Sequence, residues 1–234
     1  MVKPALTKWP ESRLGRILEK MERVHGRPGA PPFAGPFEMI LWEMVAYLAD
    51  DTRRLAAFEA LRERVGFAPK KILAASKKLL GEITRIGGSI AAEERAERLQ
   101  TAARLAVTEC GGDLAAALKL SPPEAKKLLR KFPMIGEPGA EKILMMSGVL
   151  PVLALESNGL RVLLRLGFGE DGKNYAAAYR SVREAVSGEL PKDCGILTRA
   201  HHLLRQHGQT VCLRNGPVCR ACAVSADCRF FKQR

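Results

Sequence analysis

Apolar residues recur at intervals of three and four along most of the chain, which is the spacing of one face of an α-helix. The segment 10–25 has such a stripe between charged positions, and 37–49 is apolar almost throughout, which predicts a buried helix. Further helices are predicted over 52–65, 69–80, 91–109, 112–118, 121–132, 140–148, 157–166, 175–187 and 195–207. Because no stretch sustains the period-two alternation of a strand, the sequence predicts an all-α protein.

Glycine and proline mark the places where these helices end. The segment 26–32 holds two glycines and three prolines, Gly87 and Gly88 precede another helix, and Gly148 and Gly167 follow two more. Such residues break helices because they lack helical backbone preference or a backbone donor. We expect the helices to be divided between two lobes, although composition does not mark the linker.

The charge of the chain points to a polyanionic partner. Its 234 residues include 38 Lys and Arg against 25 Asp and Glu, which gives a net charge of +13 and a pI near 9.8. Clustered basic side chains favour nucleic acids, because binding releases counterions. From Arg199 to the end, seven basic residues are opposed only by Asp227, and the alternative here is a solvated basic tail.

Membrane and secreted classes are disfavoured by the hydropathy pattern. Every apolar stretch is interrupted by charge before the roughly 18 residues that a membrane-spanning helix needs. The N-terminal segment Met1–Leu6 lacks the apolar run of a signal peptide. We therefore expect a cytoplasmic protein with no membrane partner.

Four cysteines near the end of the chain are separated by six, two and five residues: Cys212, Cys219, Cys222 and Cys228. Thiolates this close need a metal or a disulfide to offset their repulsion, and a reducing compartment disfavours disulfides. Zinc sites usually have two short Cys pairs, whereas one pair flanked by longer spacers favours a loop around a [4Fe–4S] cluster. Zinc and free thiols remain alternatives. Cys110 and Cys194 stand alone, and we interpret them as core or surface thiols.

A second motif consists of two short amphipathic segments, 122–132 and 140–148, joined by a turn with Gly136 and Gly139. Such a turn can direct free N–H groups at the start of the second helix toward a phosphate. Glycine permits the close approach because it has no Cβ. The alternative is an ordinary turn between two helices.

At these motifs the sequence resembles the endonuclease III family of DNA glycosylases, in the helix-hairpin-helix superfamily. The cysteine spacing matches the C-terminal cluster loop of that family. The turn is similar to the family's Leu-Pro-Gly-Val/Ile-Gly hairpin, with Met134 in place of a glycine, and Pro36-Phe37-Glu38 resembles the opening of its first core helix. The resemblance spans roughly residue 33 to the end.

The resemblance implies a fold, a cofactor and a partner. The fold would be two α-helical lobes with a DNA cleft between them: a six-helix lobe over 33–148 that ends in the hairpin, and an iron–sulfur lobe made of 1–32 and 149–234. A structural [4Fe–4S] cluster would shape a basic loop that meets duplex DNA. The implied DNA-binding residues are Ile135, Gly136, Gly139, Lys142, Arg214 and Arg220, and Arg229 lies beside the loop.

The expected catalytic positions depart from the family pattern. Where bifunctional members carry a Schiff-base lysine, this chain has Pro138, whose nitrogen cannot attack a sugar carbon. Lys142 is the next candidate, but it lies on the following helix. The family's catalytic aspartate corresponds to Glu156, which is one methylene longer, and its histidine corresponds to Asn158. The alternative role of Glu156 is a helix-start carboxylate favoured by the helix dipole.

A further departure concerns the residue that fills the gap left by a flipped base, a glutamine in many family members. Leu48 occupies that place here. An apolar side chain could still wedge into a base stack, but we interpret Leu48 as a core leucine.

Two functions are consistent with these patterns. The first is a monofunctional DNA N-glycosylase that flips a damaged or mismatched base from duplex DNA and hydrolyses its glycosidic bond, with Glu156 as the carboxylate. The second is a catalytically weak or inactive relative that binds DNA structures. Both imply a monomer without a nucleotide cofactor, associated with the nucleoid in a bacterium or archaeon.

Overall fold

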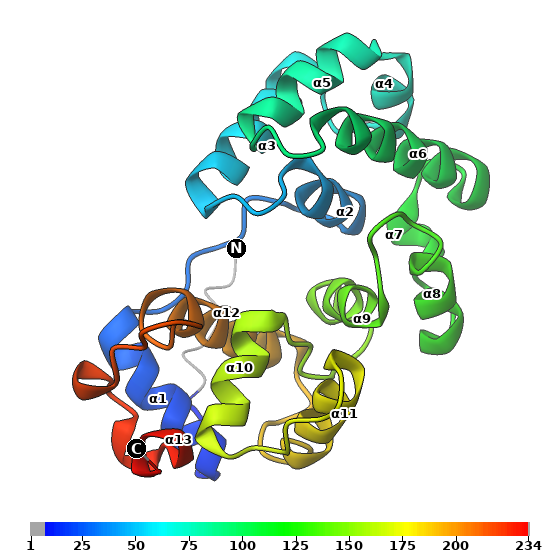
Figure 1. Cartoon of the computed structure of the whole chain (residues 1–234). Coiled ribbons are helices and arrows are strands. Elements are labelled where there is room, and N and C mark those ends of the chain that lie inside the picture. Colours follow the sequence, from blue (N-terminus) through cyan, green and yellow to red (C-terminus); the bar gives the residue numbers. More distant parts are fainter. Residues whose placement is uncertain (1–7, 234) are drawn as a thin grey trace. The chain divides into compact units, whose positions relative to one another are not determined.

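The computed structural model describes residues 8–233 (Figure 1). The expectations about the N-terminal segment Met1–Leu6 fall outside the described residues. Within residues 8–233 all regular structure is helical and no strand is present, which confirms the all-α prediction. No helix in this range is both long and apolar enough to cross a membrane.

The chain divides into two compact units, each described by itself. The continuous lobe is Ala30–Val149, and the discontinuous lobe consists of the described residues on either side of it. The continuous lobe contains α2 (Pro36–Val45), α3 (Asp51–Arg64), α4 (Pro69–Ala74), α5 (Lys77–Ile86), α6 (Ala92–Cys110), α7 (Leu114–Ala117), α8 (Pro122–Leu129) and α9 (Glu137–Met146). The discontinuous lobe contains α1 (Arg13–His25), α10 (Ser157–Leu166), α11 (Tyr175–Ala185), α12 (Cys194–Thr210), the 3₁₀ turns η1 (Cys219–Ala221) and η2 (Ser225–Asp227), and α13 (Arg229–Lys232).

The core of the continuous lobe is built around α6, which packs against α2, α4, α5 and α7. Its buried face carries small side chains such as Ala96 and Ala103 beside Leu99, so neighbouring helices can approach closely. Helix α2 packs against α3, α6, α7 and α9, which explains why its sequence is apolar almost throughout.

Several of the predicted helices have different bounds in the structure, and two of these differences have a clear local cause. The predicted helix 69–80 is in fact two helices, because Ser76 caps a new helix by accepting a hydrogen bond from the N–H of Leu79, and α5 continues to Ile86. Helix α9 starts at Glu137, three residues before the predicted start. Pro138 occupies its first turn, where a proline costs no hydrogen bond.

The discontinuous lobe is centred on the packing of α10 against α12, with α1 on α12 and α11 and α13 on α10. Gly208 allows this contact. A Cβ at that position would lie 2.7 Å from the Cβ of Asn158, well inside van der Waals distance. The two helices can therefore touch backbone to backbone only because residue 208 is glycine.

Candidate functional site

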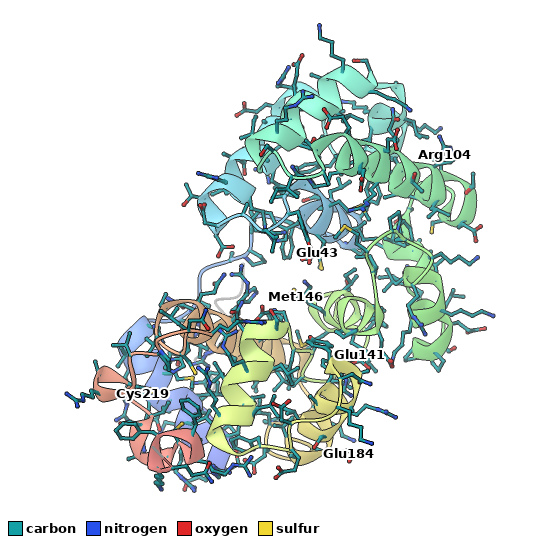
Figure 2. All side chains as sticks on the ribbon, in the orientation of Figure 1. Glu43, Arg104, Glu141, Met146, Glu184 and Cys219 are labelled. Atoms are coloured by element: carbon teal, nitrogen blue, oxygen red, sulfur yellow. The ribbon has the colours of Figure 1, made fainter. Side chains whose placement is uncertain are left out.

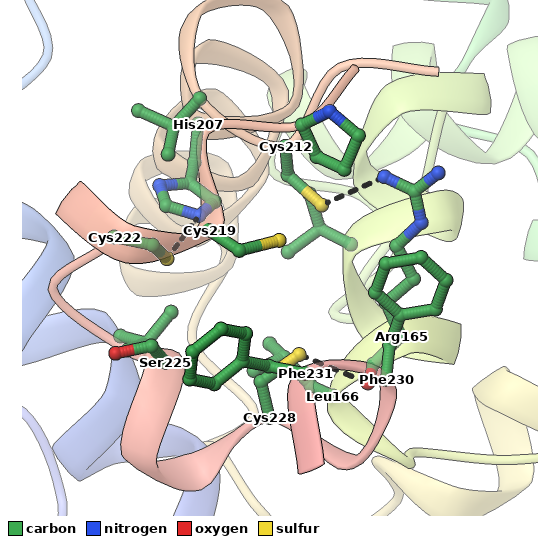
Figure 3. Close-up of a pocket in the computed structure, with 14 residues that line it drawn as sticks. Arg165, Leu166, His207, Cys212, Cys219, Cys222, Ser225, Cys228, Phe230 and Phe231 are labelled. Carbon is green, nitrogen blue, oxygen red and sulfur yellow. Dashed lines mark hydrogen bonds between the residues drawn. The ribbon is translucent and has the colours of Figure 1, made fainter. Parts of the chain in front are cut away.

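The C-terminal loop that carries the four cysteines surrounds a small, partly open pocket (Figure 3). Apolar side chains including Val162, Leu166 and Val224 line it together with Phe230 and Phe231. The four sulfurs border the same pocket, one from each cysteine of the motif: Cys212, Cys219, Cys222 and Cys228. The sequence therefore identified four side chains that the fold brings together.

The four cysteines form a donor set for a sulfur-ligated group. All six cysteines of the chain are free thiols, so no disulfide competes for the four. Among the described residues, no three His, Cys, Asp or Glu side chains converge closely enough to hold a single metal ion. Burial raises the pKa of the Cys222 thiol, and the neighbouring cysteines raise it further although a backbone hydrogen bond at Val224 lowers it. Ionising the Cys222 thiol therefore requires compensation by a nearby cation.

Arg165 on α10 holds this loop in place. Its Nη1 donates to the carbonyl oxygen of Leu213 at 2.7 Å and lies 3.4 Å from the sulfur of Cys212, while its Nη2 donates to the carbonyl of Arg214 at 3.1 Å. The guanidinium also lies over the ring of Phe230, 4.6 Å from its centroid. One side chain thus fixes both the entry of the loop and the aromatic wall of the pocket.

A hydrogen-bonded chain connects the same loop to Glu156. Arg161, one turn before Arg165 on α10, donates from Nε to the carbonyl of Cys212 at 3.0 Å and from Nη2 to that of Gly208 at 2.7 Å. The same Nη2 donates to Oδ1 of Asn158 at 2.8 Å. Asn158 in turn donates from Nδ2 to Oε2 of Glu156 at 2.8 Å. An amide can join a cation to a carboxylate because it is both acceptor and donor.

Glu156 is the N-cap of α10. Its Oε1 accepts from the N–H of Gly159 at 2.6 Å, so both carboxylate oxygens have a donor. The positive end of the helix dipole stabilises a negative charge at this position. The structure therefore places Glu156 as the helix-start carboxylate of the alternative interpretation, and its side chain is partly exposed.

A pair of histidines lies behind the cysteine loop. His207 is buried, and its Nδ1 is 2.9 Å from Nε2 of His25 on α1. Its other ring nitrogen lies 3.5 Å from the sulfur of Cys222. Burial, followed by the charge of His25, lowers the pKa of His207 to about 4. The sequence pattern gave no sign of this contact, because it depends on α1 packing against α12.

The hairpin of the continuous lobe consists of α8, a turn over 130–136, and α9. Lys126 on α8 pairs with Glu141 at 2.8 Å and with Glu137 at 3.3 Å, which ties the two helices together (Glu141 is labelled in Figure 2). Met134 has a φ of +62°, the left-handed region that costs an L-residue about 1–2 kcal/mol. The family pattern has glycine at this place, and the backbone conformation explains why.

The turn leaves a limited set of groups for an anion. Ile135 is buried and its N–H bonds the carbonyl of Phe132, so its side chain does not face solvent. Gly136 is the N-cap of α9, and a Cβ there would meet only Pro138 Cδ, at 3.9 Å. No other atom lies within 4 Å of that Cβ position, so there is open space beside the first-turn N–H groups of α9.

The other predicted contact residues differ in their surroundings. Lys142 is largely buried, and its Nζ is 2.7 Å from Oε1 of Glu43 on α2, which is labelled in Figure 2. A phosphate would have to compete with this carboxylate. Arg214 and Arg220 are exposed on the cysteine loop, whereas Arg229 pairs with Glu170 at 3.1 Å. Cys110 and Cys194 do not line the pocket, and burial raises the pKa of each thiol.

The interpretation of Leu48 as a core leucine is wrong. Its side chain is 78% exposed and its φ is +50°. Helix α2 ends at Val45, earlier than the predicted limit of 49, so Leu48 lies on a turn instead of the buried helix face. The apolar run in the sequence continues past the end of the helix, so the sequence pattern did not indicate where α2 ends.

The comparisons with known proteins agree with this geometry. No protein-family model matches the chain. The endonuclease III of Sulfolobus acidocaldarius is 24% identical over 196 residues, which cover 83% of this chain and 82% of that protein. A structure of a trapped endonuclease III–DNA covalent intermediate matches with a TM-score of 0.73 at 20% identity, over 94% of this chain and 95% of the other. In sequence and in fold, the chain resembles endonuclease III.

The endonuclease III-like fold extends to other glycosylases. A thermostable thymine-DNA glycosylase matches with a TM-score of 0.69 at 16% identity, over 94% of this chain and 95% of that one. These likenesses confirm the predicted helix-hairpin-helix glycosylase fold.

Replacing Met134 with glycine should not destabilise this endonuclease III-like chain. Glycine adopts the left-handed conformation without steric cost, so we expect Met134→Gly to raise the free energy of unfolding by about 1 kcal/mol. Met146→Gly is the control, since the same change at a helical position should lower it by about 1 kcal/mol. Denaturant unfolding measures both. A loss of stability in Met134→Gly comparable to the control would contradict the strain argument.

Proposed function

We propose that this protein is a monofunctional DNA N-glycosylase. It would bind duplex DNA, take a damaged or mismatched base out of the stack, and hydrolyse the glycosidic bond of that nucleotide. The proposal takes its reaction class from the endonuclease III-like sequence and fold. The roles it gives to individual residues are argued from the contacts of those residues in this chain.

The observation that carries the proposal is the carboxylate of Glu156 at the N-terminus of α10. Two donors from its own helix, Asn158 and the N–H of Gly159, fix its orientation. As a base leaves, positive charge develops on the sugar, and a preoriented carboxylate stabilises it without reorganisation cost. Glu156 would supply this charge stabilisation and help to position the attacking water.

We infer that no Schiff base forms. The position of the family's lysine holds Pro138, which has no free amine. Lys142 lies one helical turn later on α9, and Glu43 binds its ammonium. The Lys142 amine is therefore engaged by a side chain of α2 in the same lobe.

We propose a [4Fe–4S] cluster as the group held by Cys212, Cys219, Cys222 and Cys228. One short Cys pair flanked by longer spacers favours it over zinc, and the apolar lining of the pocket supports it. When bound, the cluster would be structural and would offset the mutual repulsion of the thiolates. The loop would then present Arg214 and Arg220 to DNA phosphates, while the start of α9, at Gly136 and Gly139, would bind another phosphate of the same duplex.

We also propose Leu48 as the residue that fills the gap left by the flipped base. It is the most exposed of the large apolar side chains on the continuous lobe. Apolar wedges of this kind enter base stacks in many proteins that distort DNA.

A second candidate function is DNA-structure binding without chemistry. The observation that favours it is that Oε1 of Glu156 caps α10 while Oε2 accepts from Asn158, a sufficient structural reason for a carboxylate at this position. This candidate keeps the DNA contacts and the cluster. It differs only in predicting that duplex binding is the whole activity.

Glu156→Gln separates the two candidates. The amide removes the charge but retains an oxygen acceptor for Gly159, so we expect base release to fall on the order of 10²-fold with the fold intact. Release of bases from a panel of lesion-bearing and mismatched duplexes measures it. Glu184→Gln, on an exposed position of α11, is the matched control.

The same assay can reject the glycosylase proposal. If the unaltered protein releases no base from any duplex yet binds them, the DNA-structure binder is the better description. Borohydride treatment should trap no covalent adduct with an abasic duplex, since Pro138 offers no amine. A trapped adduct would contradict the monofunctional assignment.

Purified protein should be brown and contain about four iron and four sulfide per chain, as the cysteine loop requires. Cys228→Ser should lose most of this iron together with the absorbance in the visible range, whereas Cys110→Ser should retain both. Metal analysis and absorption spectra check the expectation. Stoichiometric zinc in place of iron would overturn the cofactor.

The cysteine loop should contribute phosphate contacts that depend on salt. We expect the double variant Arg214→Ala/Arg220→Ala to reduce the slope of log Kd against log salt concentration by about 1.8, since each lost phosphate contact removes about 0.9. Fluorescence anisotropy with a labelled duplex at several salt concentrations provides the measurement. The exposed pair Lys70→Ala/Lys71→Ala on α4 is the control. An equal decrease of the slope in that control would mean that the effect reflects net charge and not phosphate contacts of the cysteine loop.

A further inference from the structure

Arg95 on α6 is fully buried, yet it forms no ion pair within the described chain. Its guanidinium instead donates to backbone carbonyls: Nη1 to Val45 at 3.0 Å and to Gly87 at 3.3 Å, and Nη2 to Gly88. Nε lies 3.4 Å from the carbonyl of Ala91. One side chain therefore connects the end of α2 with the connection between α5 and α6.

This arrangement stabilises a buried cation without a carboxylate. Burial lowers the pKa of Arg95, but an arginine remains charged in proteins. Val45 is the last residue of α2 and Gly87 is the C-cap of α5, so two of the carbonyls belong to the negative ends of helix dipoles. The cost of burying the charge is offset only while both helix ends stay next to Arg95.

The two turns that Arg95 connects are in direct contact. A Cβ on Gly87 would lie 2.7 Å from both Ala46 Cβ and the carbonyl oxygen of Val45. Gly88 lies close to the carbonyl of Tyr47, where a Cβ would be 3.6 Å away. Turn 46–49, after α2, and turn 87–91, after α5, therefore form one unit, here called the twin turn.

The twin turn is both strained and apolar at its surface. Leu48 and Ala91 have φ values of +50° and +51°, in the region that L-residues rarely adopt. Leu48 is 78% exposed, Ile90 is 54% exposed and Tyr47 is also exposed. Backbone strain persists only where the surroundings enforce it, and such positions concentrate at functional sites. Arg95 donates to the carbonyl of Val45, which immediately precedes one half of the twin turn, and to that of Gly88 in the other half, and so lies between the two strained positions.

We propose that Arg95 is a positioning residue for DNA: by holding the twin turn, it fixes Leu48 as a rigid projection that enters the base stack of a duplex. The proposal rests on the proposed DNA-binding function and deepens it. A leucine on a mobile turn would lose conformational entropy on insertion, whereas a turn fixed in advance has already lost it. Arg95 acts only through Leu48 and does not contact the DNA.

A double-mutant cycle between Arg95 and Leu48 tests this. The probe is a duplex with a tetrahydrofuran abasic analogue next to 2-aminopurine, and the readouts are its fluorescence on binding and the ratio of its Kd to that of an intact duplex. We expect Leu48→Ala to lower the preference for the abasic duplex about tenfold, from the lost burial of the side chain. Arg95→Lys keeps the charge but loses the fork of donors, and we expect a similar loss.

The double variant should be no worse than Leu48→Ala alone, because both changes remove the same contact. Independent effects would multiply to about a hundredfold. Leu99→Ala, one turn further on the buried face of α6, is the control for general destabilisation and should leave the preference and the fluorescence unchanged. If Arg95→Lys does not fold, Gly87→Ala replaces it in the cycle, since its methyl group would separate the two turns while Arg95 remains.

The outcomes distinguish this proposal from the function on which it rests. Multiplicative losses, an unchanged preference in Arg95→Lys, or an equal loss in Leu99→Ala would overturn the positioning role. An unchanged preference in Leu48→Ala would overturn the wedge. If the unaltered protein binds neither duplex at low salt, the proposed DNA function itself fails.

Discussion

The bonds from Arg161 and Arg165 to backbone carbonyls are the interaction that holds the cysteine loop to the helices of the discontinuous lobe. The cysteine loop has only two 3₁₀ turns and one four-residue helix of its own, so little internal structure holds it. Arg161 binds the carbonyls of Gly208 and Cys212, and Arg165, one turn later, binds those of Leu213 and Arg214. A regular helix thereby imposes its geometry on an irregular segment.

The continuous lobe uses the same device in a different place. Arg95 binds carbonyls at the ends of two helices, so its charge stabilises backbone groups that would otherwise lack partners. The guanidinium suits this task because its donors are fixed in a plane and remain protonated when buried. In both lobes, arginine side chains bind backbone carbonyls and so fix the conformation of a surface loop: the twin turn in one lobe and the cysteine loop in the other.

The sequence predicted the features that depend on local pattern. Helical periodicity predicted most of the helices, and the cysteine spacing identified four side chains that line one pocket. The break at Ser76 and the exposure of Leu48 were missed, because an apolar run does not reveal where packing partners end. The carbonyl contacts of Arg95 join residues far apart in the chain, and a buried arginine resembles an exposed one in sequence.

Pro138 has a consequence for the repair steps after base removal. Without an amine at the start of α9, the proposed hydrolysis would leave an unbroken sugar–phosphate backbone with a vacant, chemically fragile sugar. Completion of repair would then require a separate phosphodiester-cleaving enzyme to incise the strand at that sugar. Until that enzyme acts, the protein that removed the base would also be the one positioned to protect the vacant sugar.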